Sequence, residues 1–288
     1  MPYVYLISSV FCSASSSVFG TYFNRKNEGR KDTSAFYNLL LMASVFICWA
    51  VYYAFDFSFT IKVLPYSLLF ALCYTICNLG LINALKCGPS SLTTLFVSLS
   101  TILTTVWGFI FWDSNLTLPV LGGLLLVVIS LILCLYTGKK EEKKISAKWI
   151  FYVILALFGN AGCSITQRTQ QMHFNGGYAG ELMAFATLFS CIVCFIIWLK
   201  SDKTDSRIMW KGAGHFPIIA GIANMLLNYF VVLLAMTKLS PSLIYPVIGV
   251  GSLAVVILFS LFAFKEKLKY WQWTGLAIGA IATVLISN

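Results

Sequence analysis

Charged residues are scarce in this sequence. They make up 10% of its 288 residues, whereas an ordinary globular domain has roughly a quarter. The longest polar stretches, 24–33, 138–148 and 201–214, have only the length of loops, so no soluble domain is expected. Hydrophobic residues make up 59% of the chain and the mean hydropathy is +0.85. These values exclude a soluble globular protein and predict a polytopic protein of the lipid bilayer.

The residues that usually build metal and catalytic sites are also sparse. His173 and His215 are the only two histidines and fall in different loops, so no metal or nucleophile arrangement can be built around them. We therefore expect no metal, no cofactor and no enzymatic activity. Cys191 and Cys194 have a redox-like spacing, but their apolar surroundings favour packing against a neighbouring helix.

The net charge of +10 does not indicate a nucleic-acid partner. The basic residues lie in short loops between apolar runs, where lipid headgroups and the bias of membrane insertion account for them. A lipid bilayer is thus the expected surroundings of the chain, and we expect no nucleic acid among its partners.

Apolar runs of the length that crosses a bilayer, about 20 residues, recur ten times. The third and fourth runs have almost no linker, and neither do the eighth and ninth. Each such pair is expected to turn at a proline, which cannot continue the incoming helix but suits the first turn of the next. The N-terminus lacks the features of a signal peptide, so the first span is expected to be retained. The expected spans are 3–23, 34–54, 63–86, 89–111, 118–137, 148–170, 179–199, 214–237, 241–263 and 271–287.

The two halves of the chain share a short proline-containing motif at corresponding positions. The segment 86–90 (KCGPS) is repeated as 238–242 (KLSPS), 152 residues later and again between two apolar runs. Near the start of each half, five residues match at an offset of 147. Duplication of a membrane unit is a common origin of transporters. We therefore expect two five-helix repeats, over 1–143 and 144–288. The matching residues are Tyr5, Ile7, Phe11, Ala14 and Ser17 with Tyr152, Ile154, Phe158, Ala161 and Ser164.

The distribution of basic residues predicts an orientation. Loops after odd-numbered spans hold 17 of the 20 Lys and Arg residues. Because basic loops stay in the cytoplasm, both termini are expected outside. Five spans are an odd number, so the second repeat must insert in the opposite direction to the first. The sequence thus predicts an all-α, multi-pass protein of the plasma membrane with ten helices in two inverted repeats.

The end of the second repeat has a sequence pattern that resembles that of a known transporter family. The segment 264–268 (FKEKL), followed by Gly275, resembles the acidic-x-Leu then Gly pattern that closes the repeat of EamA-like transporters, the ten-helix branch of the drug/metabolite transporter superfamily. The first repeat departs from this pattern, with Ser114 where Glu266 aligns. The resemblance covers essentially the whole chain. It implies a metabolite transporter whose first, third, fourth, sixth, eighth and ninth helices surround a central cavity.

Polar side chains concentrate on those helices. In a membrane helix, polar residues occur mainly where they contact protein, water or ligand. For the hydroxyls the alternative is a small packing residue that bonds to its own helix, and for the tyrosines it is interfacial or core packing. A carboxamide needs several partners, so the asparagines indicate a site more strongly. The candidate substrate-binding residues are Ser13, Ser17, Tyr74, Asn78, Thr94, Ser98, Asn160, Ser164, Asn224, Asn228 and Tyr245.

Charges inside the expected spans are few. Arg168 and Glu181 lie near span ends, where they can pair, reach the headgroups or bind ligand. Among acidic residues, none lies near the middle of a span, and no coupling ion can be inferred. The inferred cavity lining suits a small neutral or zwitterionic solute, such as an amino acid or amine-like compound. We therefore expect a secondary transporter of such a metabolite, working by alternating access as a monomer or homodimer. The alternatives are a membrane-embedded enzyme and a non-transporting scaffold.

Overall fold

Long helices dominate the chain. The computed structural model describes residues 1–27, 29–87, 93, 96–97, 99–112, 117–135, 146–263 and 269–287. These residues form helices, with one 3-10 turn, and include no strand. The elements are α1 (Pro2–Lys26), α2 (Thr33–Phe55), η1 (Ile61–Val63), α3 (Leu64–Cys87), α5 (Ser100–Phe111), α6 (Leu118–Leu135), α7 (Ala147–His173), α8 (Ala179–Leu199), α9 (Ser206–Ala213), α10 (His215–Ala235), α11 (Pro241–Ala263) and α12 (Tyr270–Ser287).

Most of these helices can cross a bilayer. Within the described residues, six are long and apolar enough by length and composition, and four further apolar stretches are shorter. An apolar run of this length favours a helix in lipid because every backbone group is then bonded internally. The expected all-helical membrane fold is confirmed. The number of ten spans stays a prediction, since the fourth expected span, 89–111, is described only at 93, 96–97 and from 99 onward.

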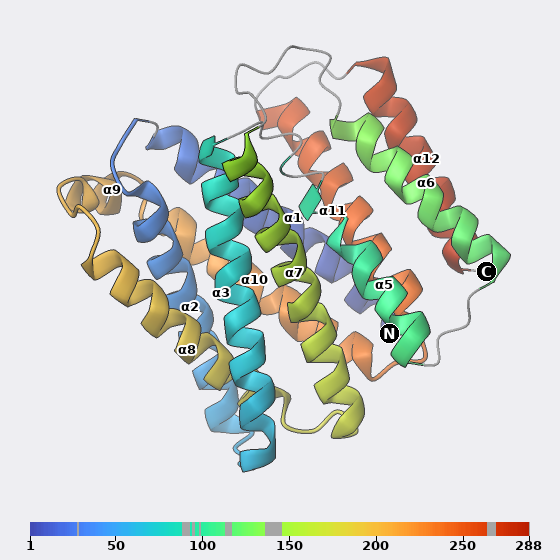
Figure 1. Cartoon of the computed structure of the whole chain (residues 1–288), viewed down its shortest axis with the longest axis horizontal. Helices are drawn as coiled ribbons and strands as arrows, with labels where there is room; N and C mark the ends of the chain where they lie inside the picture. Colours follow the sequence, from blue (N-terminus) through green and yellow to red (C-terminus); the bar gives the residue numbers. More distant parts are fainter. Residues whose placement is uncertain are drawn as a thin grey trace.

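The helix pairs follow a two-fold pattern. On the expected repeat, α1, α2, α3, α5 and α6 correspond to α7, α8, α10, α11 and α12. α3 packs on α7 as α10 packs on α1, α3 packs on α8 as α10 packs on α2, and α5 packs on α7 as α11 packs on α1. Three further pairs, α2 with α8, α5 with α11 and α6 with α12, join corresponding helices directly. Figure 1 shows that α1 and α7 run in opposite directions, as do α6 and α12.

Small residues let the paired helices approach closely. A Cβ added at Gly159 of α7 would lie 2.7 Å from the carbonyl oxygen of Cys73 in α3, and one at Gly80 of α3 would lie 2.8 Å from the carbonyl oxygen of Tyr152. In the α6–α12 pair, the Ser130 hydroxyl donates to the carbonyl oxygen of Gly275 at 2.7 Å. Glycine at such contacts brings two backbones together, which is a main source of helix association in lipid.

The polar stretch 201–214 corrects an expectation. It was predicted to be only a loop, but it contains the amphipathic helix α9. Met209 and Ala213 lie four residues apart, hence on one face, and are buried against Phe23 and Phe36. A criterion of 20 apolar residues misses so short a helix, because its stability comes from this packing.

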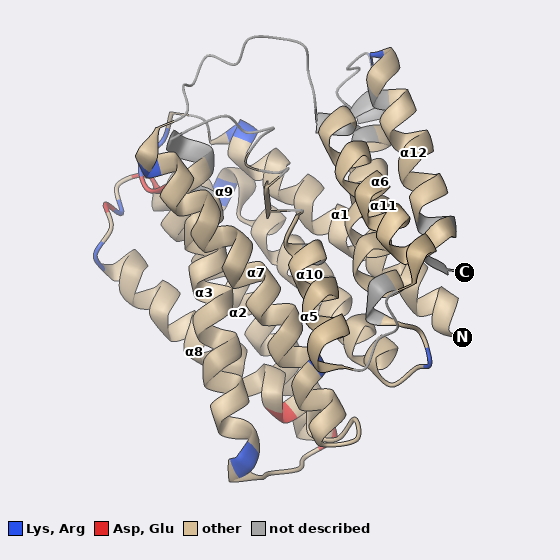
Figure 2. Cartoon of the chain, turned by 45° about the vertical axis from the view of Figure 1, so that its right-hand side comes forward, with Lys and Arg blue, Asp and Glu red and all other residues tan. Residues whose placement is uncertain are grey.

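Basic residues gather at one end of the bundle (Figure 2). This is the end where α1 and α8 finish and where α9 lies, with Arg25 and Lys26 in the last turn of α1 and Lys200 capping α8. η1, with Lys62, precedes α3 at the opposite end. The arrangement of the described basic residues follows the loop bias on which the expected orientation rests.

Candidate functional site

Helix α7 carries a polar stripe that faces other helices. Asn160, Ser164 and Arg168 follow one another at four-residue spacing and so share a face. The Asn160 amide donates to the Ser100 hydroxyl of α5 at 2.7 Å. The Tyr245 hydroxyl of α11 donates to the Ser164 carbonyl at 3.4 Å. The stripe therefore links α7 to one helix of each half.

A second polar cluster joins α3 to α10. The Tyr74 hydroxyl donates to Oδ1 of Asn224 at 2.7 Å, across 150 residues of sequence. The same oxygen accepts from the Asn228 amide at 3.0 Å. The Gln167 amide of α7 donates to the carbonyl oxygen of Asn228 at 3.2 Å, so the two clusters meet on α7. Gln167 was not among the predicted binding residues, although its place on the α7 surface beside Ser164 was a usable signal.

The carboxamides of this network retain accessible surface. Asn78, Asn160, Asn224 and Asn228 are half-buried, whereas Tyr74 and Tyr245 are only 9% and 7% exposed. Asn78 uses one amide hydrogen within its own helix, donating to the Tyr74 carbonyl at 2.8 Å. Carboxamides have two donors and an acceptor with two lone pairs, so these half-buried groups keep capacity for a further partner.

Not every predicted residue joins the network. The Ser17 side chain is exposed, and its hydroxyl bonds back to the carbonyl of Ser13 at 3.2 Å, as a packing serine would. Ser13 is half-buried on the same helix. Thr94 and Ser98 lie outside the described residues.

Arg168 stands beside the network without an ionic partner. Among the described residues it makes no salt bridge, and its buried Nε has no hydrogen-bond partner. It is close enough to Tyr245 for the two groups to interact electrostatically. Glu181, the other charge expected near a span end, instead accepts from the backbone amide of Thr60 at 3.0 and 3.1 Å. The two charges therefore do not neutralise each other.

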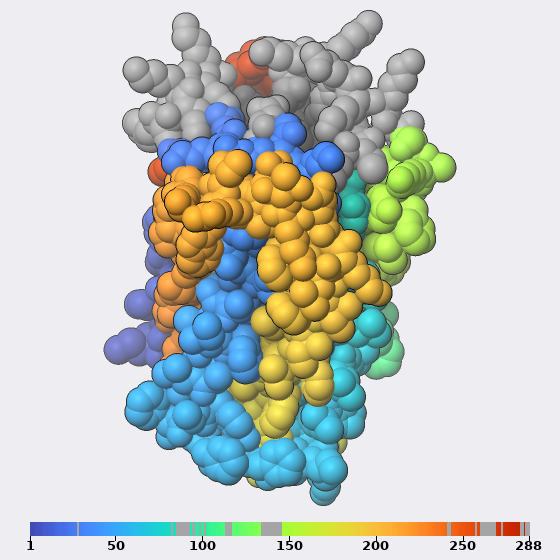
Figure 3. Space-filling view, turned by 90° about the vertical axis from the view of Figure 1, so that its left-hand side faces the viewer, coloured from blue at the N-terminus to red at the C-terminus, as the bar shows by residue number. Residues whose placement is uncertain are grey.

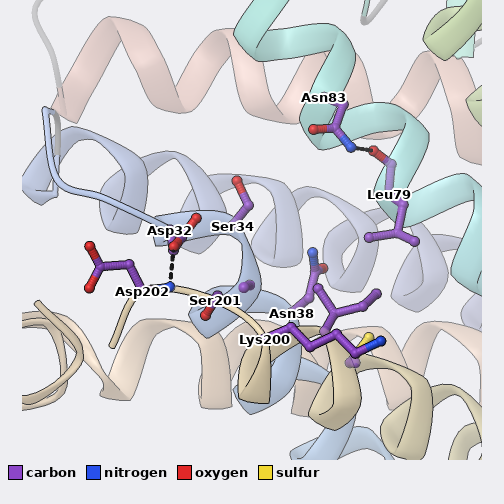
Figure 4. A pocket seen from close by; sticks show the side chains of 11 residues that line it. Asp32, Ser34, Asn38, Leu79, Asn83, Lys200, Ser201 and Asp202 are labelled. Carbon is purple, nitrogen blue, oxygen red and sulfur yellow. Dashed lines mark hydrogen bonds between the residues drawn. The ribbon is translucent and has the colours of Figure 1, made fainter. Parts of the chain in front are cut away.

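A separate pocket opens where α2 begins and α8 ends (Figure 4). Its volume is about 360 Å³, and its lining includes Asn38 of α2 and Asn83 of α3. Oδ1 of Asn38 is buried there without a hydrogen-bond partner. At its rim, the Asp202 amide donates to a carboxylate oxygen of Asp32 at 2.5 Å. Bonds from Thr204 and the nearby Lys31 ammonium lower the pKa of Asp202.

Comparisons with known proteins agree with this architecture. The family model described as the EamA-like transporter family matches residues 1–136 and 147–288. A solved structure titled only "Crystal structure of protein" shares 11% sequence identity with the chain, with a TM-score of 0.73. The match covers 99% of this chain and 95% of the other, and shows that the two share a fold. Among curated proteins, none matches. The family model matches both halves of this chain, and its apolar helices are long enough to cross a bilayer. The chain is therefore a multi-pass integral membrane protein of the drug/metabolite transporter type, and it belongs to the EamA-like transporter family.

Proposed function

We propose that the protein is a secondary transporter of a small neutral or zwitterionic metabolite, an amino acid or amine-like compound. The observation that carries this proposal is the polar network, because it draws side chains from both halves of the chain to one place. Tyr74 and Ser100 come from the first half, and Asn160, Asn224 and Tyr245 from the second. A site shared by two halves changes its access when the halves tilt, which is the geometry that alternating access needs.

The chemistry of the network suits a solute with both an amine and a carboxylate. The guanidinium of Arg168 offers paired donors to a carboxylate, and such charge-assisted bonds are stronger than neutral ones. Carboxamide oxygens of Asn78 and Asn228 and the face of a tyrosine can hold an ammonium group. A phosphorylated sugar suits the network less well, since a single guanidinium would have to offset at least two charges.

In this proposal the moving units are the two halves, 1–143 and 144–288, inserted in opposite directions as five spans each. Both termini lie outside the cell and the basic end of the bundle lies in the cytoplasm of a plasma-membrane protein. The basic residues at the α1, α8 and α9 end of the bundle support this orientation. Cysteine labelling at Lys148 from the cytoplasm alone would support it further.

Flux through proteoliposomes tests the function. The purified chain is assayed for uptake and counterflow across a panel of amino acids, amines, nucleosides and phosphorylated sugars. Asn224→Leu removes the acceptor shared by Tyr74 and Asn228, so apparent affinity should fall by about 5- to 150-fold, the equivalent of about 1–3 kcal/mol. Ser17→Ala is the matched control and should transport normally. Absence of saturable counterflow for every solute would overturn the proposal, and chemical conversion of one would favour the enzyme.

The charge requirement is tested with Arg168. Arg168→Gln should weaken binding of an amino acid by about 10-fold or more, while binding of the amine that lacks its carboxylate should change little. Arg168→Lys should recover part of the amino-acid affinity because the positive charge remains. Equal losses for both solutes would mean that Arg168 supports the fold rather than the carboxylate.

A further inference from the structure

A basic groove lies beside α9 at the end of the bundle. It is lined by Arg30, Arg207, Ile208, Lys211 and Gly212, with a volume of about 430 Å³. These five residues include three cations and no acid. Arg30 belongs to the connection between α1 and α2, in the first half of the chain, whereas Arg207 and Lys211 belong to α9 in the second.

The side chains of α9 are sorted by face. Met209 and Ala213 point into the bundle and are buried. Arg207 and Lys211 are four residues apart and occupy the opposite face. Two large apolar side chains flank this basic pair, Ile208 at 54% and Trp210 at 53% exposed. A short helix with a buried apolar face, an exposed tryptophan and outward cations has the character of an interfacial helix, which lies at the level of the lipid headgroups.

The nearby acidic groups are engaged elsewhere. A carboxylate oxygen of Asp205 accepts from the backbone amide of Lys31 at 3.2 Å. Asp202 accepts from Thr204 and forms a salt bridge with the Lys31 ammonium at 3.4 Å. In the described part of the chain, Arg207 and Lys211 make no salt bridge. Arg30 donates to Oδ1 of Asn27 at 2.8 Å, a neutral partner. Within the described residues, the three cations of the groove therefore have no acidic side chain that offsets their charge.

The groove spans a junction between segments far apart in sequence. Figure 3 shows the connection after α1 lying against the segment that contains α9, on the face of the molecule that α2 and α8 share. The Lys26 ammonium donates to the carbonyl oxygen of Gly212 at 3.3 Å, which fixes one edge of the junction. A single anion held by Arg30 and by the basic pair of α9 would bridge the two halves of the chain.

We propose that this groove binds the phosphate of an anionic glycerophospholipid headgroup from the adjacent leaflet. Arg30, Arg207 and Lys211 contact the phosphate, and Ile208 and Trp210 rest against the glycerol and upper acyl chains. Because the ligand contacts both halves, it binds most tightly to the conformation in which α9 lies against the α1–α2 connection. The lipid therefore stabilises that conformation by mass action.

Lipid titration in nanodiscs tests the proposal. The full chain is placed in phosphatidylcholine discs with increasing phosphatidylglycerol, and its thermal midpoint and retained lipid, by native mass spectrometry, are followed. The wild type should gain a saturable increase in midpoint that high salt reduces. Arg207→Gln combined with Lys211→Gln should need about 30-fold more phosphatidylglycerol for half the effect, since each cation near an anionic surface contributes about fivefold.

The control has the same change of charge outside the groove. Lys148→Gln combined with Lys203→Gln removes two exposed cations that do not line it, and should titrate like the wild type. All variants should have the wild-type midpoint in pure phosphatidylcholine, which separates lipid binding from folding. Equal losses in the groove and control variants would overturn the proposal, as would a midpoint independent of phosphatidylglycerol. Equal stabilisation by inorganic phosphate in phosphatidylcholine discs would also overturn it, because the source would then be soluble. None of these outcomes depends on the transported solute.

Discussion

The α3–α7 and α1–α10 contacts are equivalent under the two-fold repeat, each joining one half of the chain to the other, but they are built differently. In the first, Gly159 and Gly80 bring the two backbones together, and the carbonyl of Tyr152 lies against Gly80. In the second, Tyr5, which matches Tyr152 at the offset of 147, stacks on Phe230 with ring centroids 6.1 Å apart. The duplicated fold thus determines which helices meet, while local side chains determine how each contact is made.

The polar stripes of α1 and α7 differ in the same way. At the offset of 147, Ser13 aligns with Asn160 and Ser17 aligns with Ser164. On α7 the Asn160 amide donates to the Ser100 hydroxyl of α5, and the backbone carbonyl of Ser164 accepts from the Tyr245 hydroxyl of α11. The hydroxyls of Ser17 and Ser164 each bond to the carbonyl oxygen four residues earlier in their own helix, at 3.2 and 3.4 Å. An asparagine reaches a neighbouring helix where a serine is too short, so the two equivalent faces have diverged at this one position, where α7 has an interhelical bond and α1 has Ser13.

Replacing Gly159 by the residue at the equivalent position of α1 should have the largest effect on folding stability. Gly159→Cys introduces the residue found at position 12, but its Cβ would meet backbone atoms of Cys73 and Cys77 at 2.7 Å. Backbone cannot move aside as a side chain can, so the cost should exceed the about 1–3 kcal/mol typical of overpacking. Size-exclusion profiles and thermal midpoints should show loss of the folded chain.

The reciprocal change is the control for that exchange. Cys12→Gly removes a half-buried side chain at the α1 position and should leave a folded chain, with a loss of about 1 kcal/mol from the glycine itself. If Gly159→Cys folds as well as Cys12→Gly, the α3–α7 helices can separate freely and the contrast between the two contacts is wrong.

Shortening Asn160 should have an intermediate effect, on transport more than on folding. Asn160→Ala removes the amide that binds Ser100, whose side chain is 1% exposed and loses a partner. Asn160 belongs to the proposed substrate network, so loss of its contact with the solute should lower apparent affinity by roughly 5- to 150-fold, the equivalent of about 1–3 kcal/mol. Ser13→Ala, the equivalent change on α1, should keep near-normal flux. Equal defects from the two variants would show that both stripes line the path.

Asp202 should show the smallest effect, with a defined pH dependence. Thr204 and Lys31 lower its pKa in the folded chain, so its stabilising contribution is present above the pKa of the unfolded chain. That contribution is lost as the pH falls through the lower, folded value. Asp202→Asn should therefore increase proteolysis of the 201–206 connection slightly at neutral pH, and the difference should vanish in strong acid. A difference that grows toward acid would contradict the assigned direction.

The sequence by itself determined the helical, membrane-embedded character of the chain and its duplication. Hydropathy over about 20 residues is a local property that each apolar run satisfies alone, because a helix in lipid bonds its own backbone. It also identified the asparagines of α7 and α10 as candidate site residues, because carboxamides within apolar runs need partners.

Only the tertiary structure decided which of those groups meet. Nothing near Tyr74 in the sequence indicates that its hydroxyl reaches Asn224, 150 residues away. The folding of α9 likewise depends on Phe23 and Phe36, residues far from it in sequence. Arg168 differs from an ordinary headgroup-facing arginine only through what surrounds it, a buried Nε beside Tyr245. The physical reason is the same in each case: helix formation depends on neighbours along the chain, whereas hydrogen bonding between helices depends on their approach in space.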